Sequence, residues 1–207
     1  MARPKRSDGL PSAKEKIETE FWKLYEQKPI EKITVKEVCI AAGCNKTTFY
    51  YYYQDLHAVL EAIEEDCLPL EAPDMLVELL YTDDEEDKRA VITSHIENMG
   101  SRFDRYCLLL SSKGDPNFVT LVKETMARKW QERLGVDYSS LSEAAQLSVK
   151  FVIGGAVNLF AEHGEGAPFD TDAFSDVVLN FVLPATHNML AKEQITPPQT
   201  SKSLPEG

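Results

Sequence analysis

Residues 45–53 place an amide, an ammonium group, two hydroxyls and four consecutive phenols in one short segment, Asn-Lys-Thr-Thr-Phe-Tyr-Tyr-Tyr-Tyr. Lysine attracts phosphate as a point charge. Hydroxyls and phenols donate hydrogen bonds to phosphate oxygens, and tyrosine rings can contact thymine methyl groups. The segment therefore has the chemistry of a nucleic-acid contact surface. Its candidate contact residues are Asn45, Lys46, Thr47, Tyr50, Tyr51 and Tyr52.

The tyrosine run also has a structural interpretation, in which all four rings belong to a hydrophobic core. A helix cannot bury four consecutive residues on one narrow stripe, because successive side chains point in different directions. We therefore expect Tyr53 to be buried with Phe49, and the other tyrosines to face outward.

Helix start signals around this segment predict the elements that position it. Capping boxes occur at Ser12 with Glu15 and at Thr34 with Glu37, and Asn45 is a good N-cap. They predict a helix over 13–28, a short helix closed by Gly43, and a further helix over 46–52. Asp55 is placed to cap a fourth helix. A helix, a tight turn and a second helix form a helix-turn-helix, which can present the outer face of 46–52 to a major groove.

These residues resemble the N-terminal domain of the TetR/AcrR family of transcriptional regulators. The resemblance rests on Thr34, Ala42-Gly43, Thr48-Phe49-Tyr50 and the aromatic pair Tyr52-Tyr53, and is strongest from Ile33 to Leu60. It implies an all-α fold, with a three-helix helix-turn-helix DNA-binding domain followed by a larger helical domain for ligand binding and dimerisation. It also implies that Thr34 and Tyr50 contact phosphates, and that Lys46, Thr47 and Tyr51 face base edges or nearby backbone.

Two positions depart from the family pattern. Tyr52 stands where the family commonly has histidine, and Leu56 where it commonly has lysine. Both departures remove cationic contacts, so we expect modest DNA affinity with a shallow salt dependence.

The charge distribution separates the N-terminal segment from the rest. The net charge is −12, yet residues 1–57 contain 10 basic and 8 acidic residues, leaving 12 basic and 26 acidic residues in the remainder. We accordingly predict a flexible basic arm over 1–11, a DNA-binding domain over 12–57, an effector-binding and dimerisation domain over 58–193, and a disordered tail over 194–207. Arg3, Lys5 and Arg6 of the arm are either simply solvated or in contact with DNA.

Further helices are predicted in the second domain. Acidic residues at 83–87 suit a helix N-terminus, Asp115-Pro116 begins a helix that reaches Gly135, and Ser140 with Glu143 is a third capping box. The following helix is apolar on nearly every side and so requires burial against more than one neighbour. A last helix over about 171–191 contains Pro184, which predicts a kink.

A partner copy and a small-molecule effector complete the interpretation. A single short helix reads few base pairs, so we expect a homodimer, formed through helices at about 141–163 and 171–191. Gly154-Gly155 would permit close approach there, or would instead relieve crowding inside one subunit. The resemblance implies a pocket for an unidentified effector and repression as the output. Candidate pocket residues, whose spacing is more often that of a core, are His95, Met99, Phe103 and Tyr106.

Other classes find less support. We find no nucleophile elbow, phosphate-binding glycine loop or closely spaced histidine pair, so we predict no enzyme, metal or cofactor. Cys39 and Cys44 have poor zinc spacing and suit buried apolar roles, with redox sensing at Cys44 left open. The apolar stretch 151–161 predicts no membrane span and the N-terminus no signal peptide, so we expect a cytoplasmic protein. The main alternative function is a helix-turn-helix-derived protein-interaction module with little DNA affinity.

Overall fold

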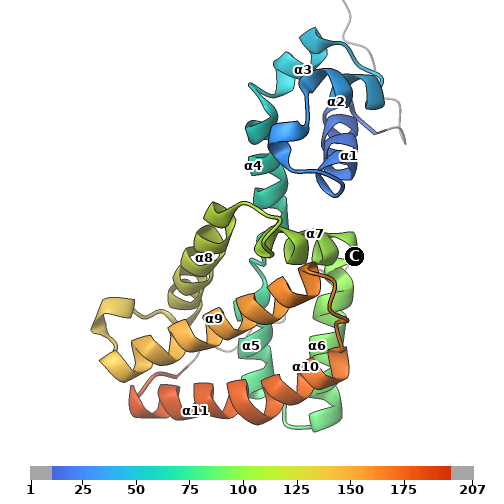
Figure 1. The fold of residues 1–207 in the computed structure, drawn as a ribbon. Helices are drawn as coiled ribbons and strands as arrows, with labels where there is room; N and C mark the ends of the chain where they lie inside the picture. Colours follow the sequence, from blue (N-terminus) through green and yellow to red (C-terminus); the bar gives the residue numbers. More distant parts are fainter. Residues whose placement is uncertain (1–10, 197–207) are drawn as a thin grey trace, which may run out of the picture. The chain divides into compact units, whose positions relative to one another are not determined.

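The computed structural model describes residues 11–196 of the chain, which are helical and contain no strand within that range (Figure 1). The predicted all-α class is confirmed for this part. The chain divides into two compact units, residues 1–66 and 67–207. The sequence placed the boundary after residue 57, in the first turn of the fourth helix, whereas the units divide after residue 66, at that helix's C-terminal end. Apart from their innermost residues, the predicted arm 1–11 and tail 194–207 lie outside the described residues.

The first unit begins with α1 (Ala13–Tyr25), α2 (Val35–Ala41) and α3 (Lys46–Tyr52), which pack against one another. Both predicted capping boxes form, at Ser12 and at Thr34. Helix α1 ends at Tyr25 rather than at residue 28, because the amides of Gln27 and Lys28 both turn back to the Leu24 carbonyl. A short 3₁₀ turn, Ile30–Lys32, precedes α2.

The interior of the first unit holds α3 in place through a few aromatic side chains. Phe21 and Phe49 are fully buried, and Tyr53 is nearly so. The Tyr53 hydroxyl donates a hydrogen bond to the Glu18 carboxylate of α1. Burial, together with that carboxylate, raises the pKa of Tyr53 well above its ordinary value, so the phenol stays neutral. The expectation that Tyr53 is a core residue is confirmed.

Helix α4 (Leu56–Cys67) follows α3 after a short turn. The Asp55 side chain accepts a hydrogen bond from the Ala58 amide at 2.9 Å, as the sequence predicted. Val59, Leu60 and Ile63 form its buried stripe.

The second unit is built from α5 (Ala72–Tyr81), α6 (Glu85–Met99), α7 (Ser101–Leu110), α8 (Pro116–Leu134) and α9 (Glu143–Gly164). It continues with α10 (Thr171–Val177), a π segment (Val178–Val182) and α11 (Leu183–Lys192). The predicted starts at 83–87 and 115–116 are confirmed, with Asp84 and Asp115 as the N-caps.

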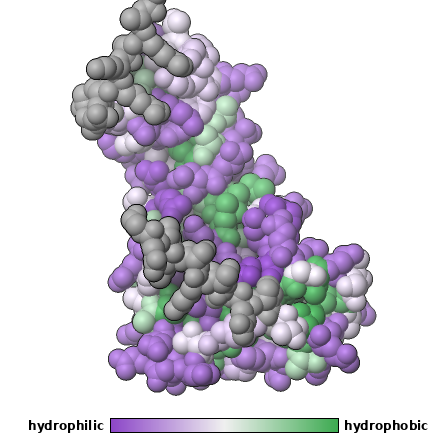
Figure 2. Space-filling model, turned by 180° about the vertical axis from the view of Figure 1, so that it is seen from behind, coloured by the Kyte–Doolittle hydropathy of each residue, from purple (hydrophilic) through white to green (hydrophobic). Residues whose placement is uncertain are grey.

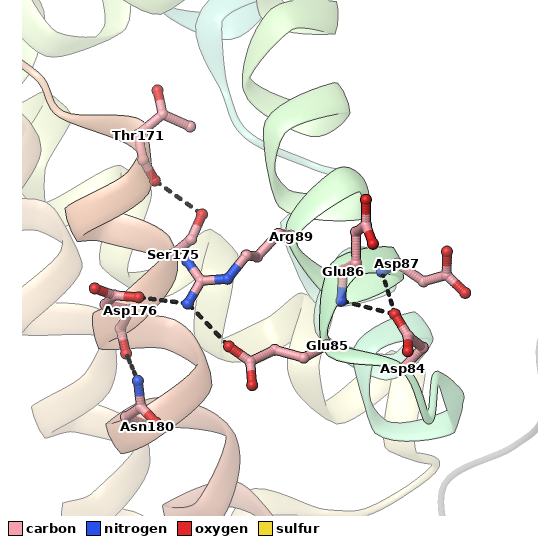
Figure 3. Close-up of polar contacts among 9 residues, drawn as sticks. All are labelled: Asp84, Glu85, Glu86, Asp87, Arg89, Thr171, Ser175, Asp176 and Asn180. Carbon is pink, nitrogen blue, oxygen red and sulfur yellow. Dashed lines mark hydrogen bonds and ion pairs between the residues drawn. The ribbon is translucent and has the colours of Figure 1, made fainter.

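Helix α9 packs most closely on α7 and runs beside α11 (Figure 1). A Cβ added at Gly164 would lie 2.1 Å from the Cys107 carbonyl oxygen, so only glycine fits this crossing of α9 and α7. Arg89 of α6 forms ion pairs with Asp176 of α10 at 2.5 Å and with Glu85 of its own helix at 3.0 Å (Figure 3). The first of these ion pairs links α6 to α10. Both carboxylates raise the pKa of Arg89.

One sequence prediction for this unit is wrong. Ser140 does not cap α9: its hydroxyl donates to the Asp137 carbonyl in a 3₁₀ turn, and Ser142 caps the helix instead, held by Glu193. The helix widens into the π segment just before Pro184, which has no amide hydrogen to donate, and the kink expected there stays a prediction. Helix α9 packs against α7, α8 and α11, so its predicted burial against more than one neighbour is confirmed, while Leu147, Phe151 and Leu159 remain exposed.

Helix α9 is also long and apolar enough to cross a bilayer by length and composition alone, with a mean hydropathy of 1.4 and 17% of that stretch buried. The sequence expectation of no span considered only residues 151–161. One such helix is weak evidence for a membrane span, since core helices of other proteins meet the same criterion.

Candidate functional site

The outer face of α3 gathers most of the residues that the sequence singled out for nucleic-acid contact. Lys46, Thr47 and Tyr50 are exposed, and Tyr51 keeps 80% of its surface open to solvent. Between them Phe49 is fully buried. The buried Phe49 ring therefore fixes α3 to the core, while the side chains on the outer face of the helix stay accessible to a ligand.

The exposed tyrosines are held by their neighbours rather than extended freely. The Tyr51 and Tyr52 rings meet edge to face with centroids 4.9 Å apart, and Tyr50 packs edge-on against Phe49 at 5.4 Å. Tyr52 is 39% exposed, so its ring is partly covered. Aromatic contacts of this kind restrict the rings while leaving the hydroxyls accessible.

Asn45 lies at the N-terminus of α3 as its cap. Its side-chain oxygen accepts hydrogen bonds from the Thr48 amide at 2.8 Å and the Thr48 hydroxyl at 3.1 Å. With the oxygen engaged, its NH₂ group is the part that can donate to an incoming acceptor.

Thr34 is less open to a phosphate than the sequence suggested. Its hydroxyl and its amide both donate to the Glu37 carboxylate at 2.8 Å. Lys28 donates to the same carboxylate at 2.7 Å. The lysine and threonine bonds lower the pKa of Glu37 to about 2. A phosphate contact at Thr34 would therefore require its hydroxyl to leave an ionised carboxylate.

An exposed residue of α2 was missed by the sequence analysis. Ile40 leaves 71% of its surface in solvent, one turn before the Gly43 turn. Val38 and Ala42 are both buried, and Ile40 lies between them in the sequence. Its position between two inward residues could have indicated the outer face.

The second unit contains a cavity of about 190 Å³. All four candidate pocket residues, His95, Met99, Phe103 and Tyr106, line it. No Asp, Glu, Lys or Arg belongs to its lining among the residues that the structure describes. Arg102 and Arg105, the basic residues next to Phe103 and Tyr106 in the sequence, do not line it either.

The ionisable groups of the cavity are held in their neutral forms. Burial lowers the pKa of His95, against the opposing charges of Glu71 and Glu78. Burial also raises the pKa of the Tyr106 phenol. The cavity thus offers apolar walls and a few neutral polar atoms, which suits an uncharged ligand.

Aromatic residues from a distant part of the chain complete one wall. Phe160 meets Phe103 with centroids 5.8 Å apart and Tyr106 at 5.6 Å, while Phe174 of α10 meets Phe160 at 5.4 Å. The sequence analysis did not assign Phe160 to the pocket, because its contacts depend on how α9 crosses α7. No local spacing could have found them.

An apolar surface adjoins the cavity. We call Leu147, Phe151, Leu159, Val177 and Phe181 the apolar face. All of these residues are exposed, and all except Leu147 also line the cavity. Figure 2, which views the molecule from the side opposite to that of Figure 1, shows apolar side chains in patches among hydrophilic ones. The cavity is therefore bounded on one side by side chains that reach solvent.

Comparison with protein-family models gave no match for this chain, and comparison with curated proteins gave none either.

Proposed function

We propose that this chain is a dimeric, DNA-binding transcriptional regulator of the TetR/AcrR type, with an N-terminal helix-turn-helix domain and a helical domain for effector binding and dimerisation. The observation that carries the proposal is the arrangement of α3, with Phe49 fully buried while Tyr50 and Tyr51 are exposed beside Lys46 and Thr47. A helix that served only the core would not expose this row of donors.

The size and chemistry of α3 suit a major groove. Seven residues give a rod of about 10 Å, comparable with a groove about 12 Å wide. Tyrosine hydroxyls donate to phosphates without adding charge, and Lys46 supplies the cation at the entering end. Each cation that neutralises a phosphate contributes about −0.9 to the slope of log affinity against log salt concentration. Since few cations contribute here, we expect a shallow slope.

The apolar face supports a dimer whose contact is formed by α9 and by the helical stretch from α10 to α11. Exposed apolar patches bounded by polar residues are typical of protein–protein interfaces. A Cβ added at Gly154 or Gly155 would meet no atom within 4 Å among the described residues, so neither glycine relieves crowding inside one subunit. The open space beside these glycines supports the other explanation that the sequence left open, the close approach of a second copy.

The cavity supports an effector that is small, apolar and uncharged. A charged ligand would have to be desolvated among walls that offer no opposite charge. A cavity of 150 Å³ with apolar walls is large enough for benzene, so 190 Å³ accommodates an aromatic molecule of similar or slightly greater size. We propose repression as the output, released when the effector binds.

Titration of the protein with its own upstream DNA, followed by fluorescence anisotropy at low and moderate salt, tests the main proposal. We expect sequence-preferring binding that weakens about tenfold in Lys46→Ala, the size of one good contact. Lys14→Ala, an exposed lysine of α1, is the matched control and should leave binding unchanged. Absence of sequence preference at every salt concentration would favour the protein-interaction module instead.

Thermal shift with toluene and with benzoate tests the class of effector. We expect toluene to raise the melting temperature and benzoate, of similar shape but charged, to leave it unchanged. Ala156 lines the cavity, so the larger side chain of Ala156→Phe should fill part of it and abolish the rise in melting temperature with toluene. If toluene binds, its effect on DNA affinity must equal the effect of DNA on toluene affinity, with a coupling of about 1–3 kcal/mol.

A further inference from the structure

Two cysteines lie on either side of the turn that joins α2 to α3. The Cys44 amide donates a hydrogen bond to the Cys39 carbonyl at 3.0 Å, and the Gly43 amide donates to the Ile40 carbonyl at 3.3 Å. Gly43 has a φ of +64°. This is the Schellman arrangement of a helix C-terminus, in which the side chains at the two ends of the six-residue turn commonly contact each other. Here these side chains are Cys39 and Cys44.

The two cysteine side chains lie beside each other and differ in accessibility. Burial raises the pKa of the Cys39 thiol, the Cys44 thiol beside it raises it further, and the Lys46 ammonium opposes both. Cys39 is buried and Cys44 is half-buried. Cys44 is therefore the cysteine more open to an oxidant from solvent, and Cys39 is its buried neighbour.

We propose that Cys39 and Cys44 form a reversible intramolecular disulfide when the protein meets a hydroperoxide, and that this bond lowers the DNA affinity of α3. The second half of this inference rests on the proposed DNA-binding function. The first half concerns only the thiols and stands independently of it.

The chemistry is balanced with hydrogen peroxide as the oxidant. The Cys44 sulfur attacks one peroxide oxygen, the O–O bond breaks, and the departing hydroxide takes the thiol proton to leave water and a sulfenic acid. The Cys39 sulfur then attacks the Cys44 sulfur, so an S–S bond forms as the S–O bond breaks. The second hydroxide takes the Cys39 proton and leaves as water. Two thiols and one peroxide thus give one disulfide and two waters, and a dithiol reductant reverses the step.

The bond would act on α3 because Cys44 directly precedes the cap of that helix. Two thiols in contact must approach further to reach the S–S bond length of about 2.05 Å, which draws Cys44 toward α2. The next residue is Asn45, whose side chain caps α3 through Thr48. Displacing this cap moves the first turn of α3 and its exposed Lys46 and Thr47.

Peptide mapping after oxidation tests the site directly. Trypsin cleavage after Lys36 and Lys46 releases residues 37–46, which contain both cysteines and no other. The full chain is treated with hydrogen peroxide, denatured, alkylated with N-ethylmaleimide and digested. We expect this peptide to be lighter by two hydrogen atoms and free of maleimide, and to accept two maleimides after prior reduction with dithiothreitol. Cys107, whose thiol pKa burial raises to about 12, should stay reduced and serve as the internal comparison.

Two variants separate the outcomes. In Cys44→Ser the remaining Cys39 should stay alkylatable after peroxide, and circular dichroism checks that the variant is folded. Peroxide should weaken DNA binding of the wild type by about tenfold, the size of one lost contact, and leave Cys44→Ser unaffected.

Cys44 found as a sulfonic acid or in a bond between two chains, with no intramolecular bond, would overturn the site. If the bond forms and the reduced protein shows no DNA binding, the proposed function fails while the disulfide stands; if both forms bind equally, the regulatory half is overturned.

Discussion

The aromatic rings of Phe151 on α9 and Phe181 on the π segment lie with their centroids 6.1 Å apart, and 67% and 53% of these residues are exposed. Two phenylalanines in contact with each other yet open to solvent leave much apolar area to be covered. Both also line the cavity, so whatever covers them also closes one side of it. The dimer and the effector site are therefore expected to depend on each other.

Substituting Phe181→Asp is expected to convert the dimer to a monomer. Burying one phenylalanine contributes about 1.5–3 kcal/mol, and a symmetric dimer loses two. A loss of about 3 kcal/mol corresponds to a roughly hundredfold higher Kd, measurable by sedimentation equilibrium. Leu121→Asp, at an exposed leucine of α8 outside the apolar face, should remain dimeric. A wild-type chain that is monomeric throughout the accessible concentration range would contradict the proposed interface.

Substituting Tyr51→Ala and Phe49→Ala should separate DNA contact from core packing. Tyr51→Ala is expected to change the free energy of unfolding by less than about 0.5 kcal/mol, because the ring is mostly in solvent. It should nevertheless weaken DNA binding about tenfold. Phe49→Ala should cost about 3–5 kcal/mol of stability, as expected for a fully buried ring. Urea unfolding and DNA titration measure the two effects, with exposed Tyr81→Ala as a control that should alter neither DNA affinity nor the α3 fold.

The helix starts in this chain could be predicted because capping is local. Asn45, Asp84 and Asp115 each accept a hydrogen bond from an amide two or three residues further on, and the sequence alone brings those partners together. The start of α9 shows the limit of this reasoning. Ser140 and Ser142 both precede good helix formers, and Glu193, distant in the sequence, engages Ser142.

The site could be predicted only as far as its residues share one element. The outward face of α3 follows from helical spacing. The row from His95 to Tyr106 has the same spacing but is divided at Gly100 between α6 and α7, so its common wall depends on how these two helices pack. The wall formed by Phe160 and Phe174 and the exposure of Phe151 depend on how α9, α10 and α7 pack together. Apolar residues at helical spacing are the same whether a neighbour covers them or not, so the sequence predicted burial where the structure leaves an open face.

His95 should make stability depend on pH. Burial lowers its pKa in the folded chain, so the unfolded chain binds the proton more readily. The contribution of His95 to the free energy of unfolding is present above its pKa in the unfolded chain, about 6.5. It is lost as pH falls through the lower pKa of the folded chain. Urea unfolding at a series of pH values from about 7.5 downward should show this loss, and His95→Gln should reduce it. An unchanged pH profile in His95→Gln would mean that the imidazole is not desolvated in the cavity wall.

Glu37 should titrate far below an ordinary glutamate because of Lys28. The pKa of about 2 comes first from the Lys28 hydrogen bond and then from the Thr34 hydroxyl and amide. Stability from this group is therefore present above the ordinary value of 4.5 and is lost as pH falls toward 2. Lys28→Met should raise the pKa of Glu37, as measured by NMR titration of its carboxyl carbon. A pKa that stays near 2 in the variant would assign the whole shift to the Thr34 cap.

Gly155→Ala should stabilise the monomer and weaken the dimer. Alanine is favoured over glycine inside a helix by about 1 kcal/mol, and a Cβ at this position meets no described atom within 4 Å of its own subunit. If a second copy approaches the backbone at Gly155, the same methyl group must hold the two helices apart. In the monomeric Phe181→Asp background the substitution should therefore raise the free energy of unfolding by about 1 kcal/mol. In the otherwise wild-type chain it should raise the Kd of the dimer, measured by sedimentation equilibrium. Tighter or unchanged association would exclude close backbone approach at Gly155 and place the contact between the two copies elsewhere on the apolar face.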